Sequence, residues 1–96
     1  MEGVEFKLDE KGNGGFYIME GNEQIGEMAI SIDEAALTVY HTEVIPAAEG
    51  KGYAKKLLEA MVEHVRNKNL KVIPLCPYVH AQFKRHEDQY ADIWLR

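Results

Sequence analysis

The sequence lacks the features that would tie it to an oxidising compartment, a membrane or a nucleic acid. Its one cysteine, Cys76, cannot form an internal disulfide, which fits a reducing compartment. No apolar run approaches the length of a membrane span, and the N-terminus, Met-Glu-Gly-Val-Glu, has no signal-peptide core. The 11 basic residues form no tract and are outnumbered by 16 acidic ones. We therefore expect a cytoplasmic protein that binds neither membranes nor nucleic acids.

What the sequence does contain is enough for one small hydrophobic core. The chain has 96 residues, of which 46% are hydrophobic, and this suits a single globular domain with little spare burial. Its net charge of -5 would attract a cationic partner more readily than an anionic one. We expect one domain over residues 1–96, present as a monomer or a weak homodimer.

Four segments in the first half of the chain have the alternation or the apolar content of β-strands. They span Val4–Leu8, Phe16–Glu20, Gln24–Ile32 and Leu37–Ile45. The segments between them are short and rich in glycine, asparagine and acidic residues, which are typical of turns. Strands joined by such short turns favour an antiparallel meander.

The second half of the chain begins with a helix, predicted for Gly50–Lys68. Its apolar stripe should pack on the sheet and consists of Ala54, Leu57, Leu58, Met61, Val62 and Val65. A fifth strand is predicted for Leu70–Leu75 and a short helix for Tyr78–His86. Because a helix joins them, Leu37–Ile45 and Leu70–Leu75 should lie parallel, and they should separate at Pro74, which cannot donate a ladder hydrogen bond. The apolar residues of the C-terminal tail should pack onto the body: Tyr90, Ile93, Trp94 and Leu95.

The run between the fourth strand and the first helix has the composition of an anion-binding loop. It reads Glu49-Gly50-Lys51-Gly52-Tyr53-Ala54. Glycines let the backbone come close to a ligand, and the free N–H groups and dipole of a helix N-terminus favour an anion such as a pyrophosphate. The spacing fits neither a Walker loop nor a dinucleotide fingerprint. The alternative is an ordinary strand-to-helix turn in which the glycines serve geometry only.

This run resembles motif A of the GNAT superfamily of acyl-CoA-dependent N-acyltransferases, usually Gln/Arg-x-x-Gly-x-Gly/Ala. A family-like Val-x-Pro precedes it at Val44 to Pro46. Glu49 stands where glutamine or arginine is usual, and a carboxylate beside a pyrophosphate is unfavourable unless its side chain points away. The order of strands and helices also resembles the core of that fold, in which acyl-CoA lies in a gap between the fourth and fifth strands.

The chain is most similar to the very small single-domain GNAT-like proteins. These carry a His-Thr-x-Val run in the fourth strand and a cysteine after the fifth, here His41-Thr42-Glu43-Val44 and Cys76. The resemblance implies a minimal GNAT-like α+β fold with a mixed, mostly antiparallel five-stranded sheet. Its order would be strand, strand, strand, strand, helix, strand and helix, with the last two strands parallel and splayed.

The resemblance also implies a binding site for acetyl-CoA or CoA. Backbone groups of Val44 and Ile45 would hold the pantetheine and polarise the thioester carbonyl. Lys51 would lie near the 3′-phosphate. Backbone amides from Gly50 to Lys55 would bind the pyrophosphate. The remaining cofactor residues of the loop are therefore Glu49, Gly50, Lys51, Gly52, Tyr53, Ala54 and Lys55.

Three residues are candidates for the chemistry of acetyl transfer. Cys76 could carry the acetyl group, donate a proton to the leaving thiolate, or simply pack in the core. His41 and Glu43 lie two residues apart on one strand face, where either could be the general base for the amine. Many GNAT proteins place a tyrosine acid on the helix after the fifth strand, but here Arg85 falls near that position and Tyr78 is a displaced substitute. The other three histidines have no metal-like spacing, so no metal site is expected.

Three functions follow from these observations. The leading hypothesis is an N-acetyltransferase that moves an acetyl group from acetyl-CoA to an unidentified amine, either a small molecule or a protein lysine. The second is a module that binds CoA or acetyl-CoA with little or no catalysis, which the unusual Glu49 favours. The third is a small α+β scaffold that binds neither ligand.

Overall fold

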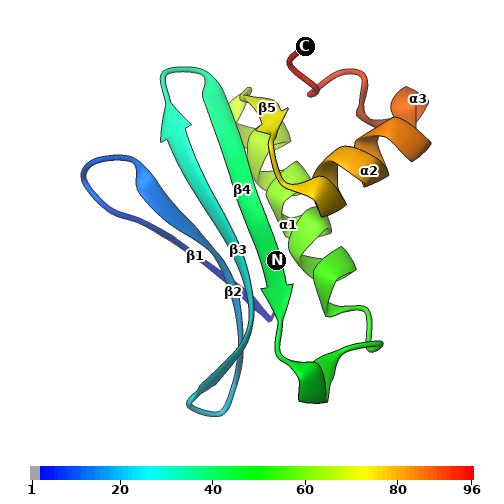
Figure 1. Cartoon of the computed structure of the whole chain (residues 1–96). Coiled ribbons are helices and arrows are strands. Elements are labelled where there is room, and N and C mark those ends of the chain that lie inside the picture. The colour runs from blue at the N-terminus through cyan, green and yellow to red at the C-terminus, as the bar shows by residue number, and fades with distance from the viewer. Residues whose placement is uncertain (1–2) are drawn as a thin grey trace.

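The computed structural model describes residues 3–96 as a five-stranded sheet with helices packed on it (Figure 1). The elements in chain order are β1 (Val4–Leu8), β2 (Asn13–Glu20), β3 (Glu23–Asp33), β4 (Ala36–Val44), a 3-10 turn (Pro46–Ala48), α1 (Tyr53–Lys68), β5 (Lys71–Pro74), α2 (Pro77–Arg85) and α3 (Glu87–Tyr90). The strands lie in sequence order across the sheet; the first three pairs are antiparallel, and β4 and β5 are parallel. The predicted α+β class, the order of elements and the parallel last pair are therefore confirmed.

β2 begins earlier than predicted, because two glycines of the expected turn belong to the strand. A Cβ at Gly14 would lie 1.9 Å from the carbonyl oxygen of Lys7, and one at Gly15 would lie 2.6 Å from that of Met28. Only glycine lets the neighbouring strands approach this closely. The turn that remains is held by Asp9, whose carboxylate accepts from two backbone N–H groups at 2.8 and 2.9 Å.

The loop before α1 stays outside the helix, which corrects the predicted helix start at Gly50. Gly50 and Gly52 have φ angles of 78° and 82°, in the left-handed region that favours glycine. A Cβ at either position would meet no atom within 4 Å, so the backbone conformation and not crowding requires glycine there. The 3-10 turn that precedes this loop was not expected from the sequence.

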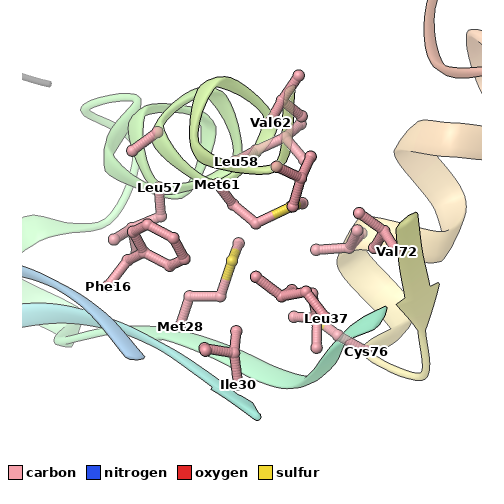
Figure 2. Close-up of a cluster of buried hydrophobic side chains, with 14 of the residues drawn as sticks. Phe16, Met28, Ile30, Leu37, Leu57, Leu58, Met61, Val62, Val72 and Cys76 are labelled. Atoms are coloured by element: carbon pink, nitrogen blue, oxygen red, sulfur yellow. The ribbon is translucent and has the colours of Figure 1, made fainter. Parts of the chain in front are cut away.

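The core lies between α1 and one face of the sheet. Figure 2 shows the buried face of this helix over Phe16, Met28 and Leu37 of the sheet. The buried residues of α1 are Leu57, Leu58, Ala60, Met61, Val62 and Val65. The predicted stripe is therefore confirmed except at Ala54, which is only half-buried. No helix within residues 3–96 is both long enough and apolar enough to span a bilayer.

β4 contains a β-bulge at Tyr40, which has no partner on β3. Before the bulge the odd-numbered residues of β4 face the core, and Leu37 and Val39 are fully buried. After the bulge the even-numbered residues face the core, because Thr42 pairs with the buried Met28. The odd-numbered residues that follow the bulge therefore point to the exposed face of the sheet.

β4 extends well beyond its short partner β5 (Figure 1). The parallel pairing ends at Val39 and Pro74, and the Cys76 N–H then donates to the Val39 carbonyl at 2.9 Å. Past this point no described strand pairs with the outer edge of β4. The predicted separation of the two strands at Pro74 is therefore confirmed.

The C-terminal segment packs against the outer edge of β5. As predicted, Tyr90 and Ile93 are buried and Trp94 is half-buried, whereas Leu95 is 47% exposed. The Val72 N–H donates to the Ile93 carbonyl at 2.7 Å, and the Leu95 N–H donates to the Val72 carbonyl at 2.9 Å. Leu95 is therefore held by its backbone and not by burial of its side chain. The helix α3, which begins this segment, was not expected.

His64 joins α1 to the N-terminal hairpin. Its ring lies against the rings of Phe6 and Phe16, with centroid distances of 4.3 and 5.7 Å. Burial, and next the charge of Lys68, lower the pKa of His64 below its ordinary value of 6.5. The folded state therefore binds this proton less readily than the unfolded state does.

This difference predicts a loss of stability in mild acid. As the pH falls through 6.5, the unfolded chain takes up the His64 proton first, so protonation favours unfolding. We expect the free energy of unfolding to fall between pH 7 and pH 5, and to fall less in a His64→Gln variant. Denaturant titration at both pH values measures this, and an equal fall in the two proteins would contradict it.

Candidate active site

The loop before α1 leaves several backbone N–H groups free. The first bond of the helix runs from the Lys56 N–H to the Gly52 carbonyl at 3.1 Å. Tyr53, Ala54 and Lys55 therefore carry the unpaired N–H groups of a helix N-terminus, and within residues 3–96 no side chain caps them. The first turn of α1 contains no acidic residue, so the positive end of the helix dipole is not neutralised there. These properties suit an anion, in keeping with the pyrophosphate site predicted for this loop.

The end of β4 presents backbone groups beside this loop. In an antiparallel pair, alternate residues direct both of their backbone groups to the partner strand. The Ile45 N–H donates to the Ile25 carbonyl at 3.0 Å, and the Ile45 carbonyl accepts from the Ala48 N–H at 2.9 Å. Val44 has the opposite parity and directs its N–H and C=O to the open edge of β4. Of the two residues predicted to hold the pantetheine, Val44 is the one whose backbone groups are free.

Cys76 lies two residues after the end of β5, at the N-cap of α2, in agreement with its predicted place after the fifth strand. Cys76 is only 2% exposed, and Figure 2 shows it among the buried side chains. The Sγ atom lies 3.4 Å from the Oγ1 atom of Thr42 on β4. Thr42 was missed as a site residue, although its place in the His-Thr-x-Val run was a signal. The contact links the two strands where they begin to separate.

Tyr78 lies half-buried in the first turn of α2. Burial is the main cause that raises the pKa of its phenol above 10.0, and negative charge on Tyr90, Cys76 and Glu59 acts in the same direction. The phenol therefore keeps its proton at neutral pH and can act as a hydrogen-bond or proton donor. Arg85 is exposed in the last turn of the same helix.

His41 and Glu43 lie on the same face of β4, as predicted, and the structure shows that this is the exposed face of the sheet. The structure adds Glu27 of β3, and one ligand atom from each of the three residues lies within 4.8 Å of the others. The His41 Nε2 and Glu27 Oε1 atoms are 3.9 Å apart. Thr42 and Cys76 lie on the core side of β4, so the sheet separates them from this cluster.

The same three residues are also the one group within residues 3–96 whose donors could hold a metal ion. Two carboxylates and an imidazole are ligands that Zn²⁺ accepts. The sequence did not reveal the group, because Glu27 lies on a different strand from His41 and Glu43 and no spacing connects them. Its members are brought together only by the pairing of β3 with β4.

A cleft of about 430 Å³ opens where β3 begins and β4 ends. Its size is within the range of small-molecule sites. Glu27 and Glu43 line it, and so does Glu49 from the predicted anion loop. The full lining is Gln24, Ile25, Gly26, Glu27, Thr42, Glu43, Val44, Ile45, Pro46 and Glu49. The cleft therefore joins the exposed cluster of the sheet to the free end of β4.

Comparisons with solved structures find the same architecture elsewhere. A GCN5-like protein from Staphylococcus aureus, described as a candidate N-acetyltransferase, is 34% identical, with a TM-score of 0.67 over 99% of this chain and 91% of that one. The ribosomal-protein-S18-alanine N-acetyltransferase of Escherichia coli is 13% identical, with a TM-score of 0.62 over 70% of this chain and 43% of that one. The aminoglycoside N-acetyltransferase AAC(6′)-Iy in complex with CoA is 20% identical, with a TM-score of 0.54 over 80% and 66%. The last two likenesses establish the fold alone.

Comparison with curated proteins finds no match to the chain. Comparison with family models agrees with the solved structures. The family model for GCN5-related N-acetyltransferases matches residues 15–93, which is most of the chain. The S. aureus structure aligns over nearly the full length of the chain. Both matches are consistent with the parallel, splayed pair of β4 and β5 and with the glycine loop before α1. The chain therefore belongs to the family of GCN5-related N-acetyltransferases.

Proposed function

We propose that the chain transfers an acetyl group from acetyl-CoA to a primary amine. The main support for the proposal is that two sets of unpaired backbone groups lie next to each other along the chain. The open edge of β4, with the free groups of Val44, leads into the loop that ends at the free N–H groups of α1. A pantetheine arm can pair with the strand edge while a pyrophosphate lies on the helix N-terminus.

The residues around this edge can serve each part of the reaction. The amine must lose a proton, and His41 or Glu43 on the exposed face can accept it, directly or through a water molecule. The neutral nitrogen then attacks the thioester carbonyl, whose oxygen can accept a hydrogen bond from the Val44 N–H as negative charge develops on it. Collapse of the tetrahedral intermediate breaks the carbon–sulfur bond, and the attacking nitrogen loses one proton as the amide forms. The CoA thiolate takes up a proton, so the products are an N-acetyl amine and CoA.

One side chain in the first turn of α2 is a candidate to protonate the leaving thiolate. Tyr78 keeps its proton at neutral pH and lies two residues after Cys76, the N-cap of α2. Because Cys76 is 2% exposed and contacts Thr42, we infer that it packs in the core and neither carries the acetyl group nor supplies an essential proton. Direct attack by the amine needs no covalent intermediate on the enzyme.

The second function, CoA binding without turnover, is favoured by a structural observation in addition to the unusual Glu49. The general-base candidates and the buried thiol lie on opposite sides of β4, so no described pair of side chains joins a nucleophile to a base. Binding of CoA is common to both functions, and turnover separates them.

CoA binding is the first test. Amide NMR during titration with CoA, and then with acetyl-CoA, should show shifts centred on residues 44–55. Ligand at about a hundredfold over its dissociation constant should add about 2.7 kcal/mol to the free energy of unfolding. For a domain of this size that is roughly ten degrees or more of melting temperature. No shift and no stabilisation at millimolar CoA would reject both functions and leave the scaffold hypothesis.

Turnover with a Cys76→Ala variant tests the role of the thiol. Thiol release from acetyl-CoA in the presence of an amine should persist in this variant within about tenfold, since a general acid contributes at least about a hundredfold when it is essential. Mass spectrometry of the wild-type protein should find no acetyl group on Cys76. Loss of turnover with unchanged CoA binding would instead make the thiol a participant.

A further inference from the structure

We infer that Thr42 is a positioning residue: by holding Cys76, its hydroxyl sets the width of the gap between β4 and α2 into which the thioester end of CoA must fit. Because the width of this gap matters only if CoA binds there, the role rests on the proposed function. Thr42 acts through Cys76 and need not contact the reacting atoms.

The contact between Thr42 and Cys76 is the outermost hydrogen bond between β4 and the segment that follows β5. The parallel ladder ends at Val39 and Pro74, and the Cys76 N–H donates to the Val39 carbonyl at 2.9 Å. Thr42 lies three residues farther along β4, about 10 Å from Val39 in an extended strand. Beyond Val39, the 3.4 Å contact of the Thr42 Oγ1 and Cys76 Sγ atoms is the one hydrogen bond within residues 3–96 that joins the two sides of the gap.

The β-bulge at Tyr40 directs the Thr42 side chain to this contact. Thr42 pairs with the buried Met28 and therefore faces the core, where Cys76 lies. In a regular ladder position 42 would be on the outer face of the sheet, out of reach of Cys76. Bulges are common beside functional sites, where they redirect a side chain. The strand is thus deformed at the place that makes this contact possible.

Both ends of the contact are anchored, so it can hold a fixed spacing. Threonine is β-branched and therefore stiff about χ1. A half-buried hydroxyl needs a hydrogen-bond partner, and the Cys76 Sγ atom is the partner that Thr42 has among the described residues. Cys76 is in turn the N-cap of α2 and is bonded through its backbone to Val39. Movement of α2 away from β4 would therefore break this bond first.

The contact lies next to the backbone groups that would hold the thioester. Thr42 has the same parity as Val44, about 7 Å farther along, so its N–H and C=O also point to the open edge of β4. The Val44 N–H belongs to β4, whereas Tyr78 belongs to α2. The contact therefore fixes the donor to the thioester oxygen relative to the candidate acid. Misplacement of such groups by about 1 Å can cost about a hundredfold in rate.

The variants Thr42→Val and Thr42→Ser test this role. The first removes the hydroxyl with little change of shape, and the second keeps the hydroxyl. NMR titration gives their affinities for CoA and for adenosine 3′,5′-bisphosphate, a nucleotide without the pantetheine arm. Thr42→Val should weaken CoA binding about three- to tenfold, the range for loss of one hydrogen bond, and change nucleotide binding by less than about twofold. Thr42→Ser should bind both ligands within about twofold of the wild type.

The matched control is Thr38→Val, the same chemical change on the same strand before the bulge. Thr38 pairs with Ile73 inside the parallel ladder, away from the gap, so this variant should bind CoA like the wild type. A merely structural role of Thr42 would lower the melting temperature of Thr42→Val without changing the ratio of the CoA and nucleotide affinities. An unchanged ratio would therefore overturn the inference, and so would a loss in Thr42→Ser as large as that in Thr42→Val.

A double-mutant cycle tests whether Thr42 acts through Cys76. Cys76→Ala removes the same contact from the other side, so the two single variants and the double variant should lose CoA affinity by similar factors. Losses that multiply in the double variant would show two independent roles and contradict the inference. Because either single change breaks the contact, Cys76→Ala carries the test if Thr42→Val does not fold.

Failure of the proposed function gives a different result from failure of this role. If the wild-type protein does not bind CoA at millimolar concentration, the proposed function is rejected and the role of Thr42 with it. If the wild type binds CoA and Thr42→Val binds it equally well, the proposed function stands and only the role of Thr42 is rejected.

Discussion

Replacement of Gly52 by glutamate is expected to remove CoA binding while the chain stays folded. Gly52 is the N-cap of α1, and its carbonyl accepts the first helical hydrogen bond. A carboxylate here would lie where the free N–H groups of α1 attract the pyrophosphate. Two charges about 4 Å apart interact by about 4 kcal/mol at an effective dielectric constant near 20. We therefore expect the CoA affinity to fall by at least about a hundredfold.

The control for this variant is Gly21→Glu. Gly21 also has a positive φ, 62°, and a Cβ there would meet no atom within 4 Å. The backbone strain of about 1–2 kcal/mol and the added charge are then similar in the two variants, but Gly21 lies in the turn between β2 and β3. Isothermal titration calorimetry with CoA, beside a denaturant melt, separates binding from folding. Wild-type affinity in Gly52→Glu, or an equal loss in Gly21→Glu, would refute the loop assignment.

Leu37→Ala is expected to have the largest effect on stability. Leu37 is 0% exposed and pairs with Val72 in the short parallel ladder between β4 and β5. Removal of a fully buried leucine side chain costs about 2–5 kcal/mol, because the transfer free energy is lost and a cavity remains. In a domain of this size, that corresponds to a fall in melting temperature of roughly 10 °C or more. Total stabilities of small domains are about 5–15 kcal/mol, so much of the margin would disappear.

The matched control is Leu75→Ala, which makes the same chemical change one residue after β5. Leu75 is 61% exposed, so this variant should melt within a few degrees of the wild type. Thermal unfolding followed by circular dichroism measures both. If the two variants were equally stable, Leu37 would not be part of the packed core that joins β4 to β5.

The periodicity of the chain was sufficient to predict most of the fold. Helical spacing identified the buried face of α1, and Pro74 located the point where β4 and β5 separate. The strand ends were less predictable, because their limits depend on partners elsewhere in the chain. Gly14 and Gly15 have turn-like composition, yet they lie in β2 because two neighbouring strands come too close for any side chain.

The site was predictable only where it is local in sequence. The glycine loop and the N-terminus of α1 are contiguous, so the spacing of these residues was enough to propose an anion site there. Glu27 lies beside His41 and Glu43 only because β3 pairs with β4. Thr42 contacts Cys76 only because the bulge turns its side chain toward the core. The 3-10 turn that engages the Ile45 carbonyl has no strong sequence signal, so Val44 and Ile45 could not be distinguished in advance.

The bulge at Tyr40 has a consequence for how such a small protein can change over evolutionary time. The bulge divides β4 into two parts. The first part contributes Leu37 and Val39 to the core, and the second part places His41 and Glu43 on the exposed face. Substitutions that retune the second half need not disturb the hydrophobic contacts of the first. The bulge itself maintains this arrangement: if Tyr40 were paired in a regular ladder, every later residue of β4 would shift by one, and His41 and Glu43 would turn toward the core. The outward side chains of the second half of β4 are thus free to diverge, whereas Thr42 and Val44 remain tied to the core.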